Sequence, residues 1–84
     1  MSLIHALLNT RVKDLPENLH VTAAVDEYYE VMIITERRVS ITVNKKKGVG
    51  KDTHLVVYDP DPELTLMQIY QKARALIEEI MYRK

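Results

Sequence analysis

The most regular pattern of apolar and polar positions lies near the C-terminal end of the chain. Between residues 63 and 82, apolar side chains recur at steps of three or four, at Leu66, Ile69, Tyr70, Ala73, Leu76, Ile77, Ile80 and Met81. This spacing places them on one face of a helix. Asp61, Pro62 and Glu63 precede the run, and these residue types are typical of a helix start. The pattern therefore predicts a long C-terminal helix that covers one face of a sheet.

A second pattern has the period of a β-strand. Val39, Ile41 and Val43 alternate with Ser40, Thr42 and Asn44, which predicts a half-buried strand. Residues 55–58 predict another strand. The polar stretch 45–52 contains both glycines of the chain, and we interpret it as the loop between these two strands.

Residues 19–35 fit two interpretations. As a helix, Val21, Val25 and Tyr29 share one apolar stripe. As strands, alternate residues from 19 to 25 are apolar, and residues 31–35 are rich in β-branched side chains, which favour strands. We favour strands, because a turn at residues 36–38 then lets 28–35 pair with 39–44 as a hairpin. That turn contains neither Gly nor Asn, which a tight hairpin prefers.

The N-terminal segment predicts one more helix. Ser2 is a suitable N-cap, the apolar residues of 3–12 recur at helical spacing, and Pro16 prevents continuation. The connections between the strands are too short for parallel crossovers, so the sheet is expected to be antiparallel. We therefore predict an α+β fold in two layers, in α-β-β-β-α order. A short antiparallel sheet of three to four strands packs against the long C-terminal helix, and residues 1–84 form a single small domain.

Composition narrows the setting of this domain. The chain has 84 residues and no cysteine, so disulfides are excluded and a reducing, cytoplasmic location is expected. The apolar stretch at residues 3–8 is too short to span a membrane. A core this small often gains stability by self-association, and a homodimer is therefore expected.

Three motifs resemble chemical sites, and each lacks a required part. The segment 48–53 resembles the end of a phosphate-binding loop, but Lys45 and Asp52 occupy positions where that motif needs Gly and Ser or Thr. The three histidines have no ligand-like spacing. The acids of residues 59–63 lack the glycine and the closing glutamate of a calcium loop. We therefore expect no enzymatic activity, no cofactor and no metal.

The formal net charge is zero, but the charges are segregated along the chain. Residues 14–30 contain five acids and no Lys or Arg. Residues 36–51 contain one acid and six bases, which are Arg37, Arg38, Lys45, Lys46, Lys47 and Lys51. In a hairpin these cations would lie at both ends of strand 39–44, where they could neutralise phosphates. This basic β-hairpin is the candidate nucleic-acid-binding site.

Apolar residues suggest a different surface. If residues 28–35 form a strand, both of its faces are apolar, and one helix cannot cover both. Either the N-terminal helix or another chain must cover the second face. The candidate interface residues are Tyr28, Tyr29, Met32 and Ile34, of types common in interface cores. We therefore predict a non-enzymatic interaction or regulatory protein that self-associates or binds a protein partner. The alternative is a nucleic-acid-binding domain that uses residues 36–51.

Overall fold

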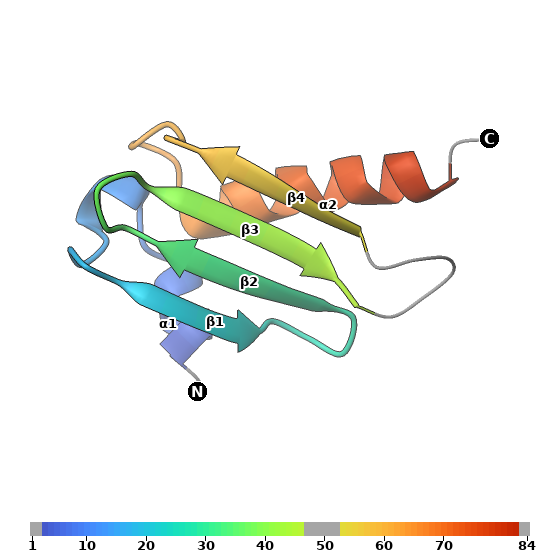
Figure 1. Ribbon diagram of the computed structural model, residues 1–84, viewed down its shortest axis with the longest axis horizontal. Helices are drawn as coiled ribbons and strands as arrows, with labels where there is room; N and C mark the ends of the chain where they lie inside the picture. Colours follow the sequence, from blue (N-terminus) through green and yellow to red (C-terminus); the bar gives the residue numbers. More distant parts are fainter. Residues whose placement is uncertain (1–2, 47–52, 83–84) are drawn as a thin grey trace.

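The computed structural model describes residues 3–46 and 53–82, and it confirms the predicted α+β class. A four-stranded antiparallel sheet has the order β1-β2-β3-β4, so each strand pairs with its neighbour in sequence. The elements, shown in Figure 1, are α1 (Leu3–Leu8), the 3₁₀ helix η1 (Val12–Asp14), β1 (His20–Ala24), β2 (Tyr29–Ile34), β3 (Ser40–Lys45), β4 (Thr53–Tyr58) and α2 (Leu66–Tyr82).

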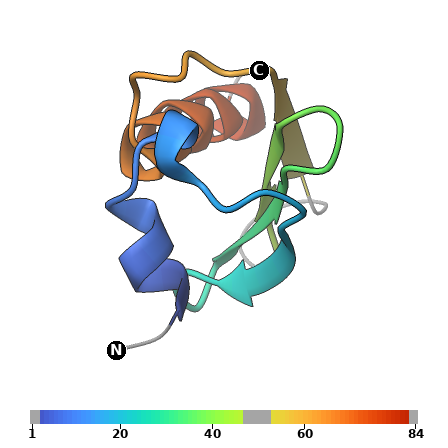
Figure 2. The same cartoon turned by 90° about the vertical axis from the view of Figure 1, so that its left-hand side faces the viewer.

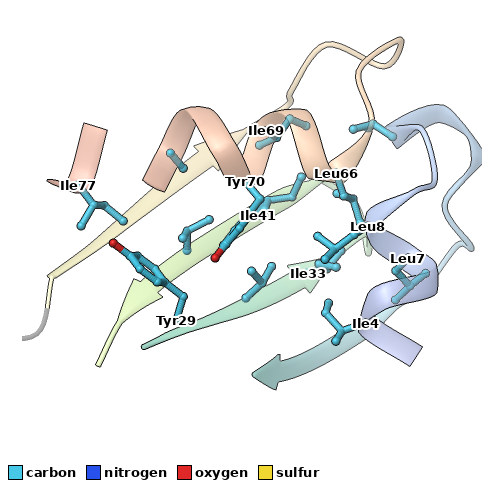
Figure 3. Close-up of a cluster of buried hydrophobic side chains, with 14 residues drawn as sticks. Ile4, Leu7, Leu8, Tyr29, Ile33, Ile41, Leu66, Ile69, Tyr70 and Ile77 are labelled. Carbon is cyan, nitrogen blue, oxygen red and sulfur yellow. The ribbon is translucent and has the colours of Figure 1, made fainter. Parts of the chain in front are cut away.

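Both α-helices lie on the same face of the sheet, as Figure 2 shows. The hydrophobic core fills the space between them and the sheet (Figure 3). Its most fully buried side chains come from all of these layers and include Ile4, Leu8, Ile33, Ile41, Leu66 and Ile77. The strand register places apolar side chains of all four strands on the face that the helices cover. Val21, Ile33, Ile41 and Val57 form one such row across the sheet. All inward-facing positions of a strand repeat with period two.

Residues 19–35 contain the two strands β1 and β2 joined by a short connection, and the helical alternative is wrong. β1 and β2 pair as an antiparallel hairpin, with Val21 opposite Ile33 and Ala23 opposite Val31. The Asp26 carboxylate closes the connection, because it accepts hydrogen bonds from the backbone N–H groups of Tyr28 and Tyr29 at 2.8 and 3.0 Å. Such local acceptance by Asp favours a turn over a continuous helix.

The connection from β2 to β3 is longer than the predicted turn at residues 36–38. It spans residues 35–39, and Arg37 adopts a left-handed conformation with φ of 59°. A non-glycine residue in this region costs on the order of 1 kcal/mol. The chain thus makes this turn without the Gly or Asn that the hairpin pattern prefers.

The helix limits differ from the predicted ones. α2 begins at Leu66, because Thr65 and not Asp61 caps it. The Gln68 N–H donates to the Thr65 hydroxyl at 3.2 Å, and the Gln68 side-chain oxygen accepts from the Thr65 N–H at 2.9 Å. This reciprocal pair is a capping box. The Asp61 carboxylate instead accepts from the Glu63 N–H. The first helix ends at Leu8 rather than near residue 12.

Candidate functional site

The predicted nucleic-acid-binding residues are divided between opposite ends of β3. Arg37 and Arg38 lie in the connection before this strand, whereas Lys45 and Lys46 lie at its end. Lys47 and Lys51 fall outside the described residues. The Arg38 guanidinium donates to Asp59 at 2.8 Å and lies 4.5 Å from the ring centre of Tyr58. Lys46 lies 3.1 Å from a carboxylate oxygen of Glu30.

Lys45 lies in the interior of the fold and not on the surface of a basic hairpin. Its side chain is only 7% exposed, and its ammonium group donates to both carboxylate oxygens of Glu78, at 3.1 and 3.3 Å. The reason is register, because Lys45 continues the inward-facing positions of Ile41 and Val43. The strand alternation of residues 39–44 already contained this signal, but the prediction grouped Lys45 with its charged neighbours.

Lys45 belongs to a polar cluster beneath one flank of α2. The Tyr29 hydroxyl donates to Glu78. Arg74 lies 4.5 Å from the Tyr29 ring centre and pairs with Asp26 at 3.4 Å. Among the described residues, no buried side-chain nitrogen or oxygen lacks a hydrogen-bond partner. The cluster therefore satisfies itself, which is the arrangement expected of a structural network.

The pKa values of two groups in this cluster are shifted in directions that favour their hydrogen bond to each other. Hydrogen bonds from Tyr29 and then from Lys45 hold the pKa of the Glu78 carboxyl below its ordinary value. Burial, followed by the Glu78 carboxylate, raises the pKa of the Tyr29 phenol above its ordinary range. Both shifts favour an ionised Glu78 and a protonated Tyr29 at neutral pH, which are the states that pair with each other.

The predicted interface residues are also separated. Tyr29 is 1% exposed and belongs to the core, because it faces inward opposite Lys45. Tyr28 is exposed beside it. Met32 and Ile34 face outward and are half-buried. They lie on the sheet face away from both helices, since α1 packs on the same side as α2 (Figure 2). The N-terminal helix therefore does not cover the second face.

The backbone of β4 presents an open edge. Within residues 3–46 and 53–82, no strand pairs with its outer side. The Asp59 N–H donates to the Val39 carbonyl at 2.8 Å, and antiparallel bonding alternates along a strand from such a pair. Residues 55 and 57 therefore bond to β3, whereas the N–H and C=O groups of His54, Val56 and Tyr58 point away from the sheet. These outward groups form the β4 edge.

An apolar groove of about 240 Å³ runs between β4 and α2. Leu55 and Val57 line it from the strand, and Ile69, Ala73 and Leu76 line it from the helix. Figure 1 shows β4 at one margin of the sheet, with α2 beside it.

Large apolar side chains are exposed at this same margin. The exposed large hydrophobic residues of the described chain are Tyr28, Tyr58, Leu76, Ile80 and Tyr82. Tyr58 belongs to β4, while Leu76 and Ile80 are one turn apart on α2. Exposed apolar surface beside an unpaired strand is typical of an interaction site. The β4 edge and this groove were not predicted, because the pairing order of the strands decides which of them is at the margin.

The chain matches no protein-family model, no curated protein and no solved structure. In the parts that the structure describes, no group of His, Asp and Glu side chains is placed to hold a metal ion. None of the described helices has the length and apolar character needed to cross a membrane.

Proposed function

We propose that this chain is a small, non-enzymatic interaction module that binds a partner strand along the β4 edge. The observation that supports this proposal is the coincidence of two features at one margin of the molecule. The outward backbone groups of His54, Val56 and Tyr58 are ready to pair, and the apolar groove beside them can receive side chains.

Strand addition explains why both features are needed. Backbone hydrogen bonds to an edge provide affinity for an extended segment, and adjacent pockets select its side chains. Natural edges are usually protected by charged residues, prolines or bulges. Between Thr53 and Tyr58 the chain contains no Pro, Lys, Arg, Asp or Glu, and its register with β3 runs without a bulge, so β4 has none of these protections.

A comparison of two proline variants tests this proposal. In V56P the substitution removes an outward N–H and leaves the bonds from β4 to β3 intact. T22P is the matched control, because the alternation along β1 places the Thr22 N–H at the opposite edge of the sheet. We expect partners captured by the wild-type chain to be retained by T22P and reduced about tenfold or more by V56P. Equal capture by all three chains, or a loss confined to T22P, would contradict the proposal.

Nucleic-acid binding by residues 36–51 stays a prediction. Of its described cations, Lys45 is buried, and Arg38 and Lys46 are paired with carboxylates. A titration with salt checks it, because affinity that depends on phosphate contacts falls steeply as salt is added.

A further inference from the structure

We infer that the strand bound by the β4 edge is the β4 strand of a second copy of this chain, related by a twofold axis through Val56. This inference rests on the proposed function, because it names the partner of the same edge. The observation behind it is that the outward groups of β4 are complementary to themselves.

The geometry follows from antiparallel pairing. With Val56 opposite Val56 of the second copy, each Val56 N–H donates to the carbonyl of the other. His54 of one copy then lies opposite Tyr58 of the other, again with bonds in both directions. Every outward N–H and C=O of the three residues is paired. A twofold axis at Leu55 would instead place Tyr58 opposite a residue that precedes β4, so the register that pairs all three residues within β4 selects Val56.

The side chains also agree with this register. On the outer face, His54 and Tyr58 become cross-strand neighbours, which is a favourable aromatic pair. On the inner face, Leu55 lies opposite Val57 of the second copy. Both already line the apolar groove, so the two grooves join across the axis.

The flank of α2 that faces the groove supplies a second layer of contact. Leu76 lines the groove together with Leu55 and Val57, which flank Val56, so the twofold axis brings the two copies of Leu76 toward each other. The twofold axis also makes the two α2 helices antiparallel. Lys72 lies one turn before Leu76 and Glu79 lies one turn after it. The lysine side of each helix thus faces the acidic side of the other, and this arrangement is complementary in charge.

Charge substitutions at the axis test the inference. A residue on a twofold axis meets its own copy, so V56E alone and V56K alone each place like charges opposite one another. The Val56 side chain is half-buried on the sheet face away from the helices, so both variants are expected to keep the fold, as circular dichroism will show. By sedimentation equilibrium we expect each variant to have a dimer dissociation constant about tenfold or more above the wild-type value.

Mixing the two variants gives the decisive result. An equimolar mixture of V56E and V56K is expected to recover association as a heterodimer, and T22E is expected to dimerise as the wild type does. Wild-type affinity in V56E, or a mixture no tighter than either variant alone, would overturn the Val56 axis. If the wild type stays monomeric while V56P still abolishes capture of another protein, this inference fails and the proposed function stands. If the wild type is monomeric and V56P changes no capture, both fail.

Discussion

The two flanks of α2 differ in how far their side chains are bonded to, or covered by, the rest of the molecule. On one flank, Glu78 and Arg74 are bonded to Tyr29, Lys45 and Asp26, which come from the hairpin side of the sheet. On the other flank, Leu76 and Ile80 remain about half exposed, at 48% and 53%, above an open strand edge. The same helix thus has one flank that is bonded within the fold and one whose large apolar side chains are exposed, where we propose that a partner binds. Substitutions on the two flanks should therefore affect different measurements.

The largest expected effect is on association. L76K places a charge in the groove beside β4, and we expect it to weaken self-association roughly 10- to 100-fold, the usual range for a central apolar contact. Q71K is the matched control, because it adds the same charge at an exposed position of α2 outside the groove. Sedimentation equilibrium measures both. Association of L76K as tight as that of Q71K would show that Leu76 is not part of the interface.

The next largest effect is expected on the free energy of unfolding, for substitutions on the flank of α2 that carries Arg74 and Glu78. K45A removes a buried cation and the packing of its stem, and leaves Glu78 without one of its donors. We expect it to lower the free energy of unfolding by about 2 kcal/mol.

K46A is the control for this change. Lys46 is the adjacent lysine, and its ion pair with Glu30 involves a side chain that is 54% exposed, so a loss below about 0.5 kcal/mol is expected. Urea denaturation of both variants gives the comparison. Equal losses in K45A and K46A would mean that the buried network does not stabilise the fold.

A smaller effect is expected from acid. The pKa of Glu78 is lowered by its hydrogen bonds from Tyr29 and Lys45, and the pKa of Glu30 is lowered by those from Lys46 and Asn44. A carboxyl with a lowered folded pKa contributes stability that is present above its unfolded pKa and is lost as pH falls through the folded value. Thermal unfolding should therefore shift to lower temperature below about pH 4.5. E78Q should show a weaker shift than E79Q, and identical profiles would contradict the assignment to Glu78.

The sequence predicted the elements of this fold better than their surroundings. Alternation in residues 39–44 and the helical spacing in 66–81 depend on local burial, so both elements were found. Lys45 was misplaced because the prediction grouped it with its charged neighbours. The strand alternation indicated its inward position, but its partner Glu78, which is 33 positions away, could not be identified from a local pattern. The start of α2 was misplaced because Asp61-Pro62-Glu63 and Thr65 are both acceptable caps, and the bridge between Arg11 and Thr65 is not visible in a local pattern.

The candidate site depends still more on tertiary structure. The apolar patterns of the strands do not show which strand lies at an edge. Only the strand order of the sheet places β4 at a margin. Leu76 and Ile80 matched the apolar stripe of a core helix, so their exposure could not be separated from the burial of Ile77. The width of the sheet beneath α2 decides which part of that stripe is covered.

Amide hydrogen exchange at Val56, measured as protein concentration is raised, decides whether β4 is the edge at which two copies associate. We expect the Val57 N–H, which bonds to β3, to be protected at every concentration. The His54, Val56 and Tyr58 N–H groups should exchange quickly in dilute solution and gain protection together as copies associate, whereas Thr22 at the other edge should not change. Protection that appears at Thr22, or an unchanged Val56 in a sample that sediments as a dimer, would contradict the claim that β4 is the binding edge.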